Sequence, residues 1–298
     1  MAEPSPAPRL GVVIPPSRPW SESREAWRSL DDWGLDVGYT WDHLTHRTVP
    51  GRWLAEGWAT VAAAAASTSR VDVGVLVASA ALRRPVALAR LAATVDDVSD
   101  GRMVLGFGAG VPTEGGADTG RVPEFGELSR LFHDTVDGLE AVWRGDTEWQ
   151  GRELSFTGIE TLPLPPGRRP PHLMLAAHGP RGLDLVARKA DGWSTYGGPQ
   201  SRDLTGDDYW AEVTRQRDRL VAACETHDRD PATVRMSLLV GFGHLRPLAS
   251  VEAYVDAVGR ATQIGFTELA VYWPDADPSS SLHADPEVLR EGVARLRA

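Results

Sequence analysis

The stretch SDGRMVLGFGAG at residues 99–110 contains one structural unit of this chain. Its first four residues form a turn after a helix that is predicted to begin at Pro85, a residue tolerated in the first turn of a helix. The apolar run Met103–Phe107 predicts a buried strand, and a glycine-rich loop, Gly106–Gly110, follows it. Helix, short turn, strand and loop in direct succession are typical of a parallel α/β sheet.

The same alternation continues in both directions along the chain. Strands are predicted at Leu10–Ile14, Asp36–Trp41, Val71–Val77, Met103–Phe107, His172–Ala176, Asp191–Tyr196, Val234–Val240 and Thr267–Tyr272, with a helix after each. We therefore predict an α/β fold, a single (β/α)8 TIM barrel over residues 10–298 with small insertions, one of them a hairpin at 149–156. An open doubly wound sheet is the alternative that counting leaves open. Residues 1–9 are rich in Pro and Ala and predict a flexible tail.

Composition narrows the class of protein. The net charge of -10 disfavours nucleic-acid binding, which depends on neutralising phosphates with basic side chains. A single cysteine, Cys224, rules out an internal disulfide and indicates a reducing compartment, so we expect a cytoplasmic protein. No apolar run approaches the roughly 20 residues that span a bilayer, so we expect no membrane association. The eight histidines are scattered, there is no His-Glu-x-x-His motif, and we predict no metal site.

In a barrel of this kind, the loops that follow the strands carry the chemistry. Asp42-His43 follows the second predicted strand. An imidazole there can exchange a proton near neutral pH, with the adjacent carboxylate either fixing its tautomer or contacting a cofactor. The structural alternative is a strand-end aspartate that caps a turn beside an exposed histidine.

Two further loops are candidates for cofactor contacts. Gly106–Gly110 resembles a dinucleotide fingerprint superficially, but Val111 occupies the sixth position, and Pro112 and Gly115-Gly116 argue against an immediate helix. We predict instead a tight turn whose backbone approaches a flat ring, with a ligand-free flexible loop as the alternative. Residues 176–181 link the fifth strand to a helix, and the N–H groups at the start of that helix suit a phosphate. The alternative is an ordinary strand-to-helix loop that binds no ligand.

Four stretches together resemble the luciferase-like monooxygenase superfamily, in particular its deazaflavin-dependent oxidoreductases. The resemblance extends from about Leu10 to Leu296 and depends on the order and spacing of these stretches. They are Gly34-Leu35-Asp36 to Asp42-His43, Glu56-Gly57-Trp58 to Gly74, Arg84-Pro85 to Gly110, and His178-Gly179-Pro180 to Asp191-Gly192-Trp193.

The resemblance implies a flavin-like ring lying across the strand ends. It assigns general acid/base catalysis to His43 and ring contact to Asp42. It also places a bulge with a non-prolyl cis peptide behind the ring, at Leu76-Val77. The remaining cofactor contacts that it implies are the backbone of Gly108 and Gly110 near the ring, and a phosphate held by Ala177, His178, Gly179, Pro180 and Arg181.

The chain departs from the family pattern in one loop. Deazaflavin-dependent sugar-phosphate dehydrogenases place a glutamate directly after the Gly-x-Gly turn, whereas this chain has Val111, which argues against a sugar phosphate as substrate. Glu114 lies three residues further on, and we do not expect it to replace that glutamate. The polar, glycine-rich segment Thr113–Val122 is predicted to be a mobile lid or a disordered insert.

We expect hydride transfer between deazaflavin coenzyme F-420 and a small organic substrate, favoured by the Gly-Pro-Arg form of the phosphate loop. The first alternative is an FMN-dependent monooxygenase that uses oxygen and a partner flavin reductase; the second is a non-catalytic flavin receptor. A nicotinamide dehydrogenase would need a glycine fingerprint after the first strand, where the chain has Pro15-Pro16-Ser17. Small side chains at Ala62–Ala66 predict close helix packing, either against the barrel or across a dimer interface, and we expect a homodimer.

Overall fold

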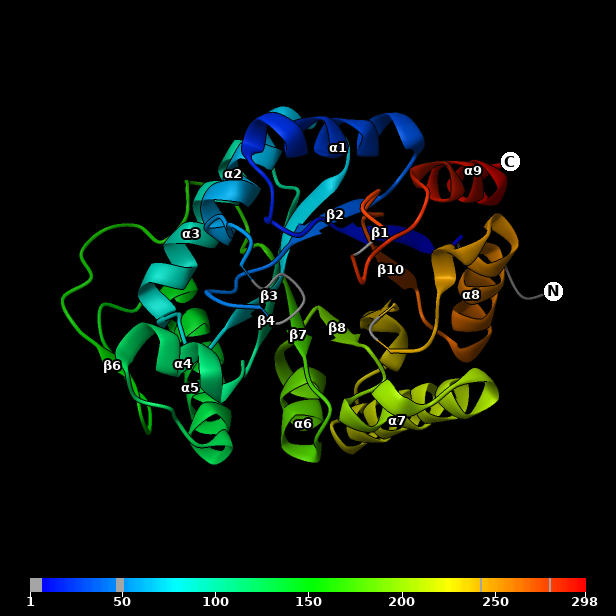
Figure 1. Cartoon of the computed structure of the whole chain (residues 1–298). Helices are drawn as coiled ribbons and strands as arrows, with labels where there is room; N and C mark the ends of the chain where they lie inside the picture. Colours follow the sequence, from blue (N-terminus) through cyan, green and yellow to red (C-terminus); the bar gives the residue numbers. More distant parts are fainter. Residues whose placement is uncertain (1–6, 47–50, 242, 279) are drawn as a thin grey trace.

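The computed structural model describes residues 7–46, 51–241, 243–278 and 280–298, and its central feature is a closed parallel barrel (Figure 1). Around the barrel the strands follow the order β1-β10-β9-β8-β7-β4-β3-β2. Closure depends on β1, which pairs with both β10 and β2, so the barrel prediction is confirmed and the open sheet is excluded. The barrel strands are β1 (Arg9–Val13), β2 (Val37–Thr40), β3 (Asp72–Ser79), β4 (Met103–Gly108), β7 (His172–Ala176), β8 (Gly192–Thr195), β9 (Arg235–Leu239) and β10 (Glu268–Tyr272).

Helices surround this barrel, as Figure 1 shows. They are α1 (Trp20–Trp33), α2 (Gly57–Ser67), α3 (Pro85–Val98), α4 (Pro112–Thr119), α5 (Phe125–Arg144), α6 (Pro180–Lys189), α7 (Gly206–Thr226), α8 (Val251–Ile264) and α9 (Pro286–Arg297), with short 3-10 turns at Pro199–Asp203, Pro231–Thr233 and Pro247–Ala249. The predicted hairpin is confirmed as the antiparallel pair β5 (Trp149–Gln150) and β6 (Ser155–Phe156). Among the helices of the described residues, none has both the length and the apolar character needed to cross a membrane.

Strand side chains alternate between two apolar clusters. Within β4, Val104 belongs to the cluster that contains Met174 and Val37, whereas Leu105 belongs to the large cluster formed with helical residues such as Leu88. The smaller cluster fills the barrel interior with side chains, so the barrel is a packed core rather than a pore. This rigid wall fixes where the loops after the strands begin.

The prediction that no helix directly follows the glycine-rich turn was wrong, and so was the disordered insert predicted within Thr113–Val122. The chain forms helix α4 there, and a role of this segment as a mobile lid stays a prediction. Pro112 occupies the first turn, where its missing N–H is not needed, and Gly120 ends the helix with a φ of 72°. Gly115 and Gly116 disfavour a helix, but the signals at its two ends outweigh them.

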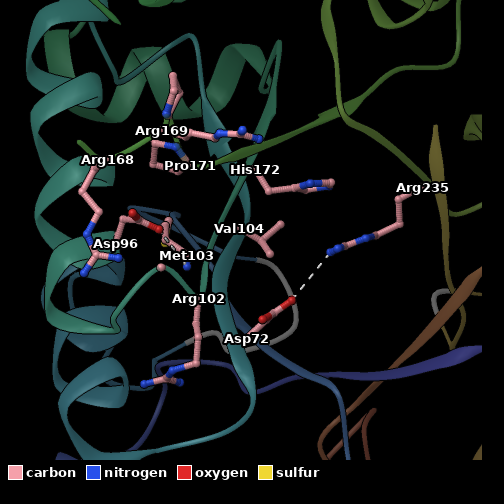
Figure 2. Close-up of a pocket in the computed structure, with 12 residues that line it drawn as sticks. Asp72, Asp96, Arg102, Met103, Val104, Arg168, Arg169, Pro171, His172 and Arg235 are labelled. Carbon is pink, nitrogen blue, oxygen red and sulfur yellow. Dashed lines mark hydrogen bonds and ion pairs between the residues drawn. The ribbon is translucent and has the colours of Figure 1, made fainter. Parts of the chain in front are cut away.

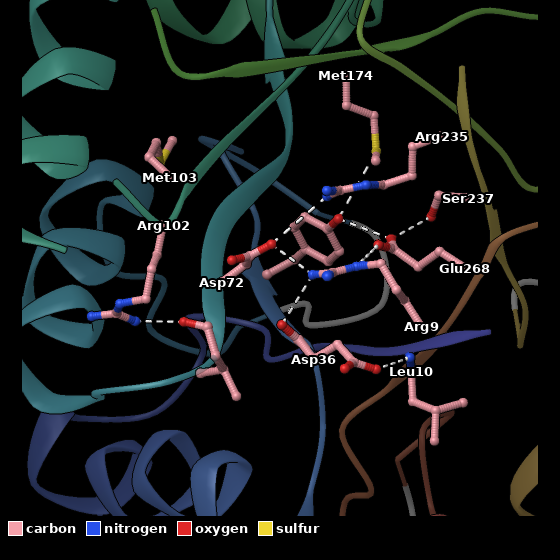
Figure 3. Close-up of polar contacts among 12 residues, drawn as sticks. Arg9, Leu10, Asp36, Asp72, Arg102, Met103, Met174, Arg235, Ser237 and Glu268 are labelled. Atoms are coloured by element: carbon pink, nitrogen blue, oxygen red, sulfur yellow. Dashed lines mark hydrogen bonds and ion pairs between the residues drawn. The ribbon is translucent and has the colours of Figure 1, made fainter. Parts of the chain in front are cut away.

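A partly buried polar network closes the N-terminal end of the barrel (Figure 3). Arg9 donates to Asp72 at 2.6 Å and lies 3.4 Å from Glu268, while the hydroxyl of Tyr39 donates to Glu268 at 2.9 Å. The side chain of Glu268 is fully buried. Arg9 is thus a strand residue in β1, which corrects the predicted tail at its last residue; residues 1–6 lie outside the described part of the chain.

This end of the barrel gives a pH prediction. Burial and, to a lesser degree, the positive charges of Arg235 and Arg9 lower the pKa of His172 to about 3. An unfolded histidine has a pKa of about 6.5, so between these values the unfolded chain binds a proton that the folded chain excludes. The free energy of unfolding should therefore fall as the pH drops below about 6.5. The free energy of unfolding, measured by urea unfolding at several pH values in this range, should change less with pH in His172→Gln than in the wild type. An equal pH dependence in the two proteins would contradict this assignment.

Candidate active site

The three predicted site segments lie at the same end of the barrel. Asp42-His43 follows β2, the glycine-rich turn completes β4, and residues 177–181 follow β7. Because all the barrel strands are parallel, their carboxyl ends share one face, where catalytic loops of such barrels lie. The predicted convergence of these segments is confirmed.

His43 is held by a carboxylate that the sequence did not assign to it. Its Nδ1 lies 3.1 Å from Oε1 of Glu114, whose other oxygen accepts the backbone N–H of Leu44 at 2.9 Å. Glu114 is 1% exposed in the first turn of α4. Burial raises the pKa of Glu114, but the hydrogen bonds from His43 and Leu44 outweigh burial, so its pKa is lowered overall. The carboxylate therefore stays ionised and favours the tautomer with a proton on Nδ1, which leaves Nε2 for proton exchange.

Asp42 does not bind His43, as it would if it fixed the tautomer of that ring; its partners are Arg83 and Trp58. Its carboxylate accepts from Arg83 Nε at 2.8 Å and from Trp58 Nε1 at 3.2 Å, and its second oxygen binds Arg83 Nη2. Arg83 also binds Glu56, the N-cap residue of α2. The tautomer of His43 is thus fixed by Glu114 rather than by Asp42, while contact between Asp42 and a cofactor ring stays a prediction.

The predicted bulge in the third barrel strand is confirmed. The Leu76-Val77 peptide is cis, and the register between β3 and β4 shifts between Val75 and Ala78. Glycine at position 106 accommodates this bulge, because a Cβ there would lie 2.2 Å from the carbonyl oxygen of Val75.

The glycine-rich turn brings main chain close to the bulge. Gly110 has a φ of 80°, and a Cβ on it would lie 1.9 Å from Oγ of Ser79, so only glycine fits. A Cβ on Gly108 would lie 3.1 Å from Cγ2 of Val77. The backbone at Gly108 and Gly110 is therefore bare of side chains, as a flat ring lying against it would require.

The loop after β7 leads into α6, whose N-cap is Gly179. Gly179, Pro180 and Arg181 are exposed, whereas Ala177 is buried. Main-chain N–H groups at the start of the helix and the cationic Arg181 suit a phosphate. These residues fit the phosphate-bearing cofactor that the family resemblance implies.

His178 is a neutral, half-buried member of this loop. Its Nδ1 lies 3.2 Å from the hydroxyl of Thr195, and its ring meets Tyr196 edge-on at a centroid distance of 4.7 Å. Burial, assisted by the charge of Arg202, lowers the pKa of His178 to about 4. A histidine that is neutral at pH 7 can fill space and form hydrogen bonds, but it is not a ready proton donor.

Aromatic rings enclose the other side of His43. Trp41 is 3% exposed, stacks on His46 at 4.2 Å, and meets His43 and Tyr272 edge-on at 5.9 Å each. Tyr272 ends β10 and is distant in sequence from His43, so no local sequence signal indicated this contact.

Among the described residues, no group of three or more His, Cys, Asp or Glu side chains is arranged to hold a metal.

Comparison with known proteins identifies the family. A model of the family described as luciferase-like monooxygenase matches residues 5–242. The chain belongs to the luciferase-like monooxygenase family. This confirms the resemblance seen in the sequence and makes the chain a member of a group of flavin- and deazaflavin-dependent oxidoreductases.

Curated relatives of this luciferase-like chain match parts of it. An uncharacterized protein of Mycobacterium tuberculosis is 30% identical over 164 residues, which are 53% of this chain and 57% of that protein. The phthiodiolone/phenolphthiodiolone dimycocerosates ketoreductase of the same species is 34% identical over 128 residues, or 42% of this chain and 33% of the relative. The matches thus span less than two thirds of either relative.

Solved luciferase-like structures match nearly the whole chain. An F420-dependent secondary alcohol dehydrogenase in complex with an F420-acetone adduct has a TM-score of 0.78 at 14% identity, covering 98% of this chain and 99% of that one. The monooxygenase RslO1 from Streptomyces bottropensis has a TM-score of 0.75 at 19% identity, covering 97% and 100%. At these identities the likeness shows the shared fold.

The Glu114–His43 contact can be tested by its effect on turnover. Replacing Glu114 with glutamine keeps the shape but removes the charge that stabilises a protonated His43. Since charged hydrogen bonds exceed neutral ones by about 1 kcal/mol, and 1.4 kcal/mol is tenfold, turnover should fall about fivefold. Asp118→Asn, on the exposed part of the same helix, is the matched control and should leave turnover unchanged. Equal effects of the two changes, measured as kcat with thermal unfolding as a fold check, would contradict the role of Glu114.

Proposed function

We propose that this chain transfers hydride between deazaflavin coenzyme F-420 and a small organic substrate, as a carbonyl reductase or alcohol dehydrogenase. The observation that carries the proposal is the His43–Glu114 pair beside the side-chain-free backbone of Gly108 and Gly110. A hydride carrier bound against that backbone would place the substrate within reach of His43, which can then exchange a proton with the substrate oxygen. The activities of the ketoreductase relative and of the F420-dependent alcohol dehydrogenase support this reaction type.

When bound, the deazaflavin supplies or accepts the hydride at the substrate carbon. The chain's own residues provide the rest. In the direction of reduction, His43 Nε2 donates a proton to the substrate oxygen, and the ionised Glu114 stabilises the imidazole while it is protonated. The aromatic contact of Trp41 with His43 limits the access of water from that side.

The cofactor loops have separate tasks in this proposal. Gly108 and Gly110 pass their backbone near the ring, with the Leu76-Val77 bulge behind it. The cofactor phosphate would bind at the start of α6, where the helix dipole favours an anion. The residues that would hold it are Ala177, His178, Gly179, Pro180 and Arg181. Asp42 acts from the end of β2, where Arg83 fixes its orientation.

An FMN-dependent monooxygenase is the second candidate, favoured by the structural likeness to RslO1. This reaction would need oxygen, reduced flavin and a partner flavin reductase. Absorbance titration of the purified protein with coenzyme F-420 and with FMN separates the two functions. The proposal requires tighter binding of F-420, with Arg181→Gln weakening it; preferential FMN binding with oxygen-dependent turnover would replace it with the second candidate.

We further propose that the protein is a homodimer with α2 at the interface. Ala64 and Ala65 are buried within the chain, but Ala66 is exposed and Ala62 is half-buried, so a small-residue face is available to a second copy. Light scattering at micromolar concentration should give twice the chain mass of 32.2 kDa. Ala66→Glu should shift the protein towards monomer; a monomeric wild-type protein would contradict the proposal.

A further inference from the structure

A cavity of about 370 Å³ opens at the end of the barrel opposite the candidate active site (Figure 2). Residues at or before the starts of four strands line it, including Asp72 of β3, Met103 of β4, His172 of β7 and Arg235 of β9. Pockets that hold small molecules are typically about 300–1,000 Å³. The space therefore exceeds that of a single water and accommodates a small solute.

We call this cavity at the N-terminal end of the barrel the floor cavity. Its lining is rich in positive charge, although the chain as a whole is acidic. Its charged residues are Arg102, Arg168, Arg169 and Arg235 against Asp72 and Asp96. Asp72 is already neutralised by Arg9 at 2.6 Å, and Arg102 donates to backbone carbonyls such as that of Ser99 at 2.7 Å. The remaining guanidinium groups are those of Arg169, of Arg168, which also pairs with exposed Asp100, and of Arg235, which forms an ion pair with Asp72 at 3.7 Å.

Two buried polar atoms at the cavity lack hydrogen-bond partners among the described residues. They are Nε2 of His172 and Nη1 of Arg235, which lies 3.7 Å from Asp72, beyond hydrogen-bond distance. Figure 2 shows the ring of His172 and the guanidinium group of Arg235 in the same part of the cavity, with the guanidinium group directed toward Asp72. Nη1 of Arg235 is a donor, and Nε2 of His172 is one when it carries the ring proton. A buried donor without a hydrogen-bond partner costs about 1–3 kcal/mol, so an acceptor beside Arg235 would be stabilising.

We propose that the floor cavity binds a phosphate-type oxyanion, either free phosphate or the phosphoryl group of a small metabolite. Arginine suits such an anion because its planar fork donates paired hydrogen bonds to two oxygens. Arg169 and Arg168 approach from the segment before β7, and Arg235 and His172 donate from the strand starts. The site is separate from the cofactor phosphate loop, which lies at the other end of β7.

Calorimetric titration of the full chain tests this site, with inorganic phosphate and phenyl phosphate as ligands at constant ionic strength set by chloride. We expect saturable binding of one anion per chain. Arg169→Gln should weaken it about tenfold or more, since a charged hydrogen bond contributes about 1.5–3 kcal/mol and 1.4 kcal/mol is tenfold. Arg24→Gln, at an exposed position of α1, is the matched control and should bind as the wild type does. Tighter binding of phenyl phosphate would identify a phosphorylated metabolite, and tighter binding of phosphate the free anion.

Arg181→Gln distinguishes the floor cavity from the cofactor loop at the opposite end. This variant should keep anion binding to the floor cavity, even though the proposed function requires it to weaken F-420 binding. Phosphate binding that is lost in Arg181→Gln but kept in Arg169→Gln would overturn the floor site. The absence of saturable heat with either anion would overturn it as well, and neither result depends on which flavin the protein uses.

Discussion

Replacing His43 with alanine is expected to lower turnover about 10²–10⁴-fold, the usual loss when a general acid/base is removed. The effect should be large because Glu114 holds the imidazole in one tautomer, with Nε2 free for the substrate. Cofactor affinity should change little, since the phosphate loop and the glycine backbone are untouched. Measuring kcat and the cofactor Kd on the same preparation separates the two quantities.

Near-normal turnover in His43→Ala would contradict this assignment. Glu114 would then be the better candidate for proton transfer, because it is the buried carboxylate that the removed imidazole would have covered. His178 is a weaker candidate, since its lowered pKa keeps it neutral. The variant Glu114→Gln in the His43→Ala background decides between these outcomes: no further loss is expected if the two residues act as one unit.

Replacing Arg83 with methionine is expected to lower the free energy of unfolding by about 3–5 kcal/mol, because it leaves the carboxylate of Asp42 buried without its cation. The Asp42 side chain is 3% exposed, and only the indole N–H of Trp58 would remain to it among the contacts described. Urea unfolding measures the loss directly.

The reverse change should cost less. In Asp42→Asn, Arg83 keeps Glu56 as a partner, and its side chain is 21% exposed, so water can solvate the charge. The double variant should be less destabilised than the sum of the single changes, since both remove one contact. An Asp42→Asn loss equal to that of Arg83→Met would show that burial of Asp42 is not the dominant cost. Asp42→Asn should also weaken cofactor binding if Asp42 contacts the ring.

Much of the fold could be predicted because its signals are local. Apolar runs such as Met103–Phe107 mark strands wherever they occur, and Gly34 ends α1 with a φ of 84° through its own backbone freedom. The motif Asp42-His43 was identified for the same reason: it directly follows a strand. Helix α4 was not predicted, because its internal glycines are poor helix formers. Its local signals are at its ends, with Pro112 in the first turn and Gly120 as the C-cap.

The sequence by itself therefore determined the order of strands and helices, the single barrel and the loops that carry the candidate site. Only the tertiary structure decided which side chains meet. Glu114 reaches His43 across 71 positions, and Arg83 reaches Asp42 across 41. The floor cavity likewise joins residues from Asp72 to Arg235. Secondary structure follows from the chemistry of neighbouring residues, whereas these contacts exist because closing a parallel barrel brings strand ends together that are distant along the chain.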